Sequence, residues 1–593
     1  MLFTGKNMVG DSRQRPDLLT TLRLAVGKRN VIVGKRQTRR FSTGYRTGKG
    51  DVLAVVRPGT LVEQWRVVKA CINANVIVIM QASNTGLTGG STPRDQGYDR
   101  PVVLVSTTRI KGIHIINEGR QAVCLAGATL YELERKLSNV GRQPHSVIGS
   151  SCIGASVVGG VCNNSGGALV QRGPAYTELS LYAQADETGE LRLVNHMGID
   201  LGDDPETILD RLERQDYTEN DISYTPDKRA SACDYGDNVR LVDDPTPARF
   251  NADPTRLYEA AGSAGRLIVF AVRLDSFPLD DDCSTFYVGT NDPKHLTAMR
   301  RHMLTDFEHL PISAEYIHRD AFDIAAVYGK DTFFAIDRLG TDWLPQLFAF
   351  KARLDSFASR FGALSGFSDR LLQMASRLLP NLLPPRLREF RNRFEHHLIL
   401  KVSASGAEET RAYFSASSPD SAGVFECSPL EARRAFLHRF AVAGAAVRYR
   451  LIHADTVEDI VAIDVALPRN TLDWFEELPV EIDQHILHKI YYGHFFCHVF
   501  HQDYVVARGV NPHALEDQIL ATIDRRGGEY PAEHNVGHLY SAKPALAQFY
   551  RDLDPGNHFN PGIGHTPAEF CWQKGQGERV ADDRYLHISQ KRS

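Results

Sequence analysis

The first part of the chain alternates short apolar runs with amphipathic stretches. Apolar runs of strand length, rich in β-branched residues, occupy residues 51–58 (DVLAVVRP), 76–80 (VIVIM) and 101–107 (PVVLVST). Residues 60–75 and 130–141 instead place apolar side chains at helical spacing. The alternation predicts α/β or α+β architecture in which glycine-rich turns follow the strands.

Flanking stretches follow this pattern less closely. Residues 1–50 are basic and are expected to form a weakly structured lead-in, and residues 200–245 are acidic and are expected to form a long, irregular surface excursion. Residues 266–277 (RLIVFAVRLDSF) predict a buried strand. Residues 280–320 and 395–500 mix strand and helix patterns and predict a second domain.

Chain length, composition, net charge and cysteine content narrow the class of protein. A chain of 593 residues is long enough for three or four domain-sized units. An apolar content of 42%, a charged content of 24% and a mean hydropathy of -0.28 are typical of a soluble globular protein. A net charge of -4 gives no overall field that would attract nucleic acid, and no apolar run is long enough to cross a bilayer. The nine cysteines are scattered, which indicates free thiols in a reducing, cytoplasmic setting.

Two uncharged glycine loops carry the first functional signal. Residues 81–91 (QASNTGLTGGS) and 149–167 (GSSCIGASVVGGVCNNSGG) combine glycine with short hydroxyl and amide side chains. Such loops let main-chain N–H groups approach a phosphate closely, although ordinary turns remain the alternative. The second loop lacks G-x-G-x-x-G, and residues 44–50 (GYRTGKG) are one residue short of a phosphate-binding P-loop, so a Rossmann site and phosphoryl transfer are disfavoured.

The first loop resembles the pyrophosphate-binding loop of the vanillyl-alcohol oxidase and p-cresol methylhydroxylase flavoproteins. The resemblance implies a bound FAD. It implies contacts at Ala82, Ser83, Asn84, Thr85, Gly86, Gly90 and Ser91, then at Gly149, Ser156 and Gly166, and through main chain near Val269. Neither loop contains the histidine or tyrosine that would attach FAD covalently, so non-covalent FAD is expected.

The likeness extends over nearly the whole chain. The segments RTGKGDVLAVVRPG, QPHSVIGSSCIGAS, FLHRFAVAGAAVRY, PAEHNVGHLY and DPGNHFNPGIG resemble the bacterial respiratory branch of that family, which oxidises D-lactate and reduces quinone. The resemblance implies an α+β fold with a two-subdomain FAD-binding domain, a substrate (cap) domain and a basic membrane-binding insertion. The expected boundaries are 1–275 for the FAD domain, 276–317 and 395–526 for the cap, 318–394 for the insertion, and 527–593 for a C-terminal segment that returns to the FAD domain.

Oxidation of a 2-hydroxy acid by a flavin needs a base for the hydroxyl proton and a cation for the carboxylate. Glu533 and His534 match the family's Glu-His motif, which implies that His534 is the base, with Asn535 replacing a glycine of the motif. A histidine without chemistry is the alternative.

For the carboxylate, Arg439 occupies the position of the family's substrate arginine. Arg319 and Arg448 are alternatives, and surface ion pairs would explain all three without chemistry. The family's accompanying lysine is Ala462 here, which favours a small substrate such as D-lactate.

A metal site is the remaining question at this motif. His494 and His501 keep a spacing seen in related dehydrogenases, which implies a divalent ion with Glu533 as third ligand. In one extended strand, seven residues span about 23 Å, so the two histidines share an ion only if the chain turns between them. The family's Gly-Asp-Gly-Asn turn is missing, and histidines packed among aromatic rings are the favoured alternative.

Residues 351–394 carry nine Lys or Arg and only three Asp or Glu, interleaved with Leu, Phe and Met. Next to an anionic leaflet each cation contributes about 1 kcal/mol, so this stretch predicts a peripheral membrane-binding element. A solvated helical face is the alternative, and no nucleic-acid-binding motif accompanies the charge.

Together these features predict a peripheral enzyme on the cytoplasmic side of the inner membrane, which oxidises D-lactate with FAD and passes electrons to quinone. A soluble flavin dehydrogenase of another D-2-hydroxy acid, coupled to a carrier protein, is one alternative. A non-enzymatic, membrane-binding scaffold is the other.

Overall fold

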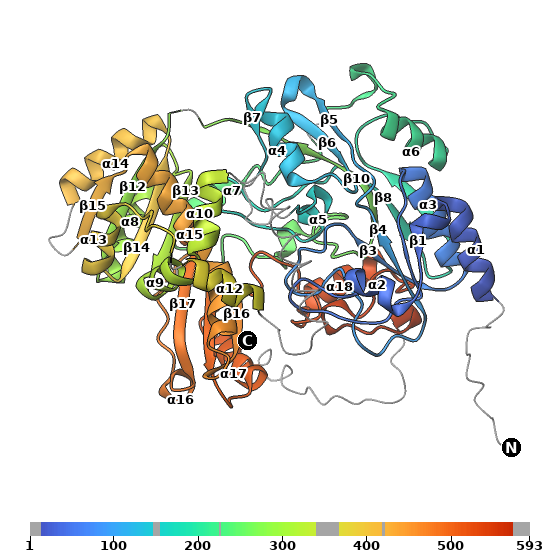
Figure 1. The fold of residues 1–593 in the computed structure, drawn as a ribbon. Helices are drawn as coiled ribbons and strands as arrows, with labels where there is room; N and C mark the ends of the chain where they lie inside the picture. Colours follow the sequence, from blue (N-terminus) through green and yellow to red (C-terminus); the bar gives the residue numbers. More distant parts are fainter. Residues whose placement is uncertain are drawn as a thin grey trace, which may run out of the picture.

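The computed structural model describes residues 14–145, 154–224, 227–280, 282–339, 367–376, 378–417 and 422–572. Figure 1 shows two parts side by side, one built from the first 280 residues and the end of the chain, the other around a large sheet from the second half. The helices and strands of both parts confirm the expected α+β class.

A four-stranded sheet opens the first part. Its order is β1 (Val31–Ile32), β2 (Ala54–Val56), β4 (Val102–Ser106), β3 (Ile77–Gln81). Strands β2, β4 and β3 are parallel, and they confirm the three predicted apolar runs. Helix α3 (Leu61–Asn73) connects β2 to β3 and begins where the Thr60 hydroxyl accepts a hydrogen bond from the Glu63 N–H.

A five-stranded antiparallel sheet follows. Its order is β5 (Ile113–Ile116), β6 (Gln121–Leu125), β10 (Ile268–Asp275), β8 (Ser180–Ala185), β9 (Leu191–Asn195). Strand β10 is the predicted buried strand; seven of its eight residues are buried because it lies in the middle of the sheet. Two further strands, β7 (Arg142–Gln143) and β11 (Phe277–Pro278), pair nearby.

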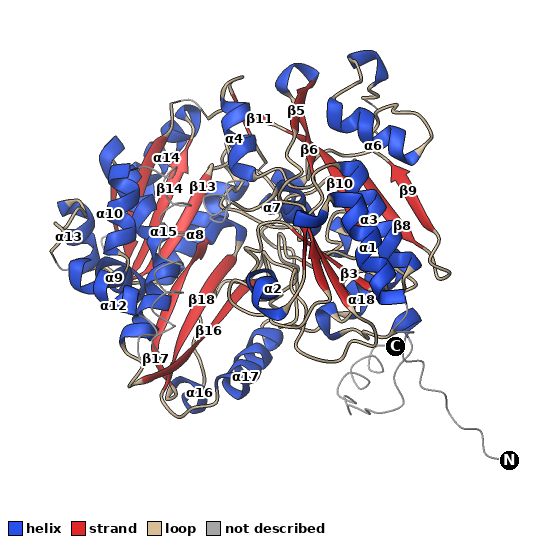
Figure 2. Ribbon diagram, turned by 45° about the vertical axis from the view of Figure 1, so that its right-hand side comes forward, coloured by secondary structure: helices blue, strands red, loops and turns tan. Residues whose placement is uncertain are grey.

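The second part is built on a seven-stranded antiparallel sheet (Figure 2). Its order is β15 (Ala422–Glu426), β12 (Ser284–Thr290), β14 (His396–Val402), β13 (Ser313–His318), β17 (Ile486–His494), β18 (Val499–Ala507), β16 (Val457–Ala466). Helices α9 (Arg319–Tyr328) and α15 (Pro429–Ile452) pack on each other and on this sheet through a shared apolar cluster.

The other helices lie between or beside these sheets. They are α1 (Gln14–Val26), α2 (Lys35–Ser42), α4 (Leu130–Ser138), α5 (Val157–Cys162), α6 (Pro205–Arg214), α7 (Tyr235–Arg240), α8 (Pro293–Thr305), α10 (Lys330–Leu339), α12 (Phe367–Ser376), α13 (Pro385–Arg393), α14 (Ala404–Ser417), α16 (Val480–Asp483), α17 (Pro512–Arg525) and α18 (Pro544–Leu553). Helix α4 confirms the second predicted helix.

Two expectations about irregular stretches are wrong. The N-terminal lead-in contains α1 and α2 within its described residues, and the acidic excursion contains α6 and α7. In α6 the Asp204 cap and a proline at the first turn start the helix, and Leu209 and Leu212 are buried on one face. The high content of acidic side chains on the exposed face hid this helical spacing.

The basic insertion is only partly described, since residues 340–366 and Arg377 lie outside the described residues. In α13, Arg386 forms an ion pair with Glu431, and Arg391 pairs with Asp323. These two cations are therefore neutralised within the protein. None of the described helices is long and apolar enough to cross a membrane.

Residues 544–572 lie against the first part (Figure 1). Phe559 forms a parallel bridge with Val78 of β3, and the Asn560 side chain donates hydrogen bonds to the Gly90 and Ala264 carbonyls, both at 2.8 Å. Phe559 and Asn560, near the end of the described chain, thereby form part of the surroundings of the first glycine loop.

Candidate active site

In the first glycine loop, the main-chain carbonyl groups and the main-chain N–H groups have different surroundings. Its carbonyls face the protein: those of Leu87, Thr88 and Gly90 accept hydrogen bonds from Thr47, His538 and Asn560. In contrast, no main-chain N–H of residues 83–91 donates to an acceptor within the described part of the chain. A row of unpaired N–H groups is what an anion-binding loop requires.

The two loops contact each other directly. The Ser83 hydroxyl donates a hydrogen bond to the Gly154 carbonyl. Ser156 begins α5, where its side chain accepts a hydrogen bond from the Gly159 N–H at 3.0 Å. Gly149, the remaining expected residue of this loop before Gly166, lies outside the described residues.

Asn535 lies between the loops. Its amide donates to the Asn163 side chain at 2.6 Å and accepts from the Thr88 hydroxyl at 3.2 Å. A Cβ atom on Gly90 would lie 2.4 Å from the Asn535 amide, and one on Gly166 would lie 2.6 Å from the Glu533 carboxylate. Glycine is required at both positions because these side chains approach the main chain so closely.

These features fit a dinucleotide diphosphate. Gly86 is exposed and has no atom within 4 Å of the place where a Cβ would stand, so a ligand can approach its main chain. Asn84 has φ 55°, a left-handed conformation that turns successive N–H groups toward one side. Val269 is different: it lies in the β10–β8 ladder, and its carbonyl accepts a hydrogen bond from Gln64 at 3.4 Å.

The chain turns sharply between the two candidate metal ligands. Strands β17 and β18 form a hairpin around residues 495–498, with His498 in the left-handed conformation at φ 53°. Ligand atoms of His494, His501 and Glu533 all lie within 4.8 Å of one another. The hairpin therefore removes the geometric objection based on an extended strand. The same histidines also contact aromatic rings, since His501 lies against Tyr492.

A buried glutamate of β13 links the hairpin to the expected substrate arginine. Glu315 lies 2.6 Å from Nδ1 of His494 and 3.0 Å from Nη2 of Arg439. The Arg439 guanidinium also lies over the Tyr492 ring, 4.5 Å from its centre. Arg439 extends from α15 toward β13 and β17 in the middle of the sheet, and only 9% of its surface is exposed.

Glu533 is held by a second buried arginine. Its Oε1 accepts a hydrogen bond from Nη2 of Arg249 at 2.8 Å, and its Oε2 lies 3.5 Å from His494 and 3.7 Å from His501. Arg249 also donates to the Gly167 carbonyl. The second glycine loop and the histidine hairpin are thus joined through one carboxylate. We call Arg249, Glu315, Arg439, His494, His501 and Glu533 the charged cluster.

Burial and neighbouring charges shift the pKa values of this cluster in different directions. Burial alone would lower the pKa of His494, but Glu315 and Glu533 outweigh it and raise that pKa to about 9. Burial would raise the pKa of Glu533, but His494 and Arg249 hold it well below its usual range. Burial lowers the pKa of His501 well below its usual value. At neutral pH, His501 and Glu533 are therefore in the protonation states that a metal requires, whereas His494 carries a proton that a metal would have to displace.

His534 lies at the exposed border of the cluster. Its side chain is 31% exposed, and its Nε2 lies 3.9 Å from Oδ2 of Asp464. That same Asp464 oxygen accepts a hydrogen bond from the Glu533 N–H at 2.7 Å. One carboxylate therefore fixes the main chain before His534 and lies near enough to attract a positively charged imidazole.

The alternative arginines lie in other ion pairs. Arg319 pairs with Glu395 and Arg448 with Asp331. Ala462, which stands at the position of the family's lysine, pairs across the sheet with Asp503. Burial raises the pKa of Asp503 to about 6.

Sequence reasoning missed Arg249, Glu315 and Asp464. Glu315 is the single acid of β13, and Asp464 stands within the apolar run 460–466 of β16; an acid in such surroundings indicates a buried charge that needs a partner. Arg249 lies in an irregular segment and gave no comparable signal.

Comparisons with known proteins show the fold and the family of this chain. Residues 52–191 match the model of an FAD binding domain, and residues 285–572 match the model described as D-lactate dehydrogenase, membrane binding. The structure is similar to that of p-cresol methylhydroxylase with substrate bound, with a TM-score of 0.54 at 12% identity over 94% of this chain and 98% of that chain. Fold and matched segments thus define an FAD-binding flavoprotein, which confirms the fold and the cofactor expected from the loops.

Relatives that match nearly the whole chain identify the family within the FAD-binding flavoproteins. The chain is 56% identical over 564 residues to the quinone-dependent D-lactate dehydrogenase of Haemophilus influenzae, covering 94% of this chain and 99% of the relative. It is 52% identical over 561 residues to the enzyme of that name from Escherichia coli, covering 94% and 98%. The chain belongs to the quinone-dependent D-lactate dehydrogenase family.

Proposed function

We propose that the protein oxidises D-lactate to pyruvate and passes the electrons to quinone. The relatives that match nearly the whole chain carry this activity in their names. The observation that carries the proposal is the position of the buried cation Arg439 and the half-buried base His534 on one charged cluster, which Glu533 and Arg249 join to the second glycine loop.

Residues of the chain have separate roles in this reaction. Bound FAD would supply a hydride acceptor at N5 of its ring. Arg439 binds the substrate carboxylate, and Glu315 orients Arg439 through their 3.0 Å ion pair. His534 takes the proton from the substrate hydroxyl, and Asp464 stabilises the imidazolium that results.

We also propose that the loops hold FAD without a covalent bond. The unpaired N–H groups of residues 83–91 bind its diphosphate, and residues 82–86 together with Gly90 and Ser91 surround it. Gly149, Ser156, Gly166 and the main chain near Val269 remain the expected contacts of the second loop and β10.

His494, His501 and Glu533 are proposed to hold a divalent ion. Two imidazoles and one carboxylate leave coordination positions open for a substrate oxygen. The ion would polarise the substrate hydroxyl and so ease proton removal by His534. Metal analysis of purified protein, and activity after chelation and after re-addition of Mn²⁺ or Zn²⁺, tests this role.

The location and the boundaries are proposals as well. The matched membrane-binding family model supports peripheral membrane association, and we assign it to the cytoplasmic side of the inner membrane. The units proposed are 1–275, 276–317 with 395–526, 318–394, and 527–593.

Anaerobic mixing with candidate substrates tests the function. D-lactate is expected to bleach the visible flavin absorbance, and a soluble quinone is expected to restore it. Fast bleaching by D-2-hydroxyglutarate but not by D-lactate would favour a dehydrogenase of another acid. Purified protein that is colourless, and remains so with added FAD, would favour the scaffold.

A further inference from the structure

The sheet face next to the proposed base is built from rows of paired residues on β17, β18 and β16. In one row, Tyr492 pairs with His501, and His501 pairs with Asp464. Arg439 lies over the Tyr492 ring at one end, 4.5 Å from its centre. His534 lies 3.9 Å from Asp464 at the other end. The proposed carboxylate-binding cation and the proposed base therefore stand over the two ends of this row, with His501 between them.

The positions on the two sides of this row differ in character. On one side is the charged cluster, since His494, two residues beyond Tyr492 on β17, lies 3.5 Å from Glu533. On the other side, Asp503 pairs with Ala462. Side chains two residues apart on a strand point to the same face and are about 7 Å apart. A substituent on C2 of the substrate that points away from the charged cluster therefore lies over Asp503 and Ala462.

Asp503 is a buried carboxylate without an ion pair. Its Oδ2 accepts a hydrogen bond from the Tyr492 hydroxyl at 3.2 Å. Its Oδ1 keeps some accessible surface and has no hydrogen-bond donor among the described residues. Burial raises the pKa of Asp503 to about 6, although Arg46 and Arg439 lie near enough to oppose this shift. Arg46 donates instead to the Ile460 carbonyl, at 3.1 Å. At pH 8 the Asp503 carboxylate is therefore ionised, and no cation pairs with it directly.

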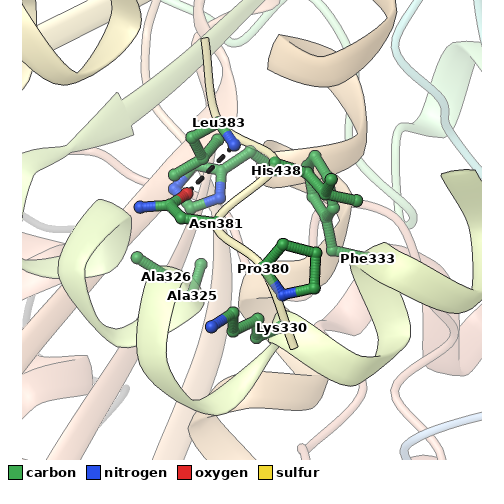
Figure 3. A pocket seen from close by; sticks show the side chains of 9 residues that line it. Ala325, Ala326, Lys330, Phe333, Pro380, Asn381, Leu383 and His438 are labelled. Carbon is green, nitrogen blue, oxygen red and sulfur yellow. Dashed lines mark hydrogen bonds between the residues drawn. The ribbon is translucent and has the colours of Figure 1, made fainter. Parts of the chain in front are cut away.

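Apolar packing closes the same face beyond Asp503. Val505, two residues further along β18, is fully buried in the apolar cluster that α9 and α15 form on the sheet. A cavity that borders this cluster, lined by Lys330, Phe333 and His438 among others (Figure 3), has a volume of about 20 Å³. Such a volume accommodates about one water molecule. A C2 substituent of the substrate therefore ends near the Asp503 carboxylate and does not extend past it.

We propose that Asp503 determines the substrate specificity of the site: its carboxylate repels a 2-hydroxy acid whose side chain ends in a second carboxylate. An acid with a short, uncharged side chain is not repelled. At about 7 Å and an effective dielectric constant of about 20, Coulomb's law gives a repulsion equivalent to about 50-fold in kcat/KM. This role rests on the proposed oxidation of a 2-hydroxy acid and adds the class of acid that the site rejects.

Two substrates of similar shape separate charge from size. D-malate and D-2-hydroxyisocaproate carry side chains of the same branching, but only that of D-malate ends in a carboxylate. With a soluble dye as acceptor at pH 8, the kcat/KM of wild type for D-malate is expected to be at least tenfold below that for D-2-hydroxyisocaproate. Asp503→Asn should raise the ratio of the two kcat/KM values at least tenfold. A ratio does not depend on the fraction of active enzyme, so partial loss of folded protein does not imitate this result.

Two further variants show whether the charge of Asp503 is responsible. Asp503→Glu keeps the negative charge and should keep the low ratio. Asp459→Asn removes a charge from the same sheet, but Asp459 is paired with Arg450 at 3.2 Å, so this variant should behave like wild type. Where one of the acids is not oxidised, its inhibition constant against D-lactate takes the place of kcat/KM in the same comparison.

Three outcomes would overturn the proposal. The first is a wild type that uses D-malate as well as D-2-hydroxyisocaproate, and the second is an unchanged ratio in Asp503→Asn. The third is an equal gain for both acids in Asp503→Asn, since this would make Asp503 a matter of space and not of charge. Failure of wild type to reduce its flavin with D-lactate would contradict the proposed function instead, so the two failures are distinguishable.

Discussion

The first glycine loop and the charged cluster handle charge in opposite ways. The loop contains no ionisable side chain and leaves a row of N–H groups unpaired, while its carbonyls are bonded to the protein. The cluster buries two arginines, two glutamates and two histidines and connects them within a few ångströms. The dipoles of main-chain N–H groups suffice for a ligand that is itself charged and remains bound. Full charges with matched partners suit a reaction in which a proton and a small anion must be fixed in position.

The largest effect should come from the half-buried base next to this cluster. His534→Ala is expected to slow flavin reduction by D-lactate by about 10²–10⁴-fold, because a positioned base contributes that much. The FAD content should be unchanged, since the imidazole is absent from the loops. Stopped-flow absorbance measures the rate. A rate near that of wild type would show that the base lies elsewhere.

Removal of the buried cation should have the next largest effect. Arg439→Met is expected to lower kcat/KM for D-lactate by about 10–100-fold, because hydrogen bonds to a charged group contribute about 1.5–3 kcal/mol. Arg319→Met is the matched control, because Arg319 is bound to Glu395 instead. If the control loses as much activity as the variant, Arg439 does not bind the carboxylate.

The uncharged loop can be tested by adding a single methyl group. Gly86→Ala should weaken FAD binding by about tenfold, since overpacking costs about 1–3 kcal/mol. The thermal stability of the apoprotein should be unchanged because no protein atom lies within 4 Å of the new Cβ. Gly444→Ala, at an equally open position in α15, is the control and should leave FAD affinity unaltered. Unchanged affinity in Gly86→Ala would contradict a diphosphate at this loop.

The smallest effect concerns pH. The pKa of Asp503 is raised by burial to about 6, so the neutral carboxyl stabilises the fold fully below about pH 4, and this contribution is lost as the pH rises through 6. Asp503→Asn should therefore raise the melting temperature by a few degrees at pH 8 and by less at pH 5. Calorimetry across this range measures the difference. The exposed Asp455→Asn serves as control, and a gain that is equal at both pH values would contradict the assignment.

Local patterns predicted the elements that local residues determine. Strand β10 and helix α3 follow from runs of apolar residues, and the first loop follows from its glycines. The partners of the cluster were not predictable in this way, because Arg249, Glu315 and Glu533 are far apart in sequence and meet only through the sheet and the returning C-terminal segment. The hairpin between His494 and His501 was missed because it forms without the family's glycine turn and depends on His498 adopting a left-handed conformation.

The return of the chain end has a consequence for biosynthesis. Asn560 supports the Gly90 carbonyl and Phe559 pairs beside β3, so the first loop acquires its final support only after residue 560 of 593 has left the ribosome. Until then the nascent first part must persist without these contacts, and cofactor uptake becomes a late event of maturation.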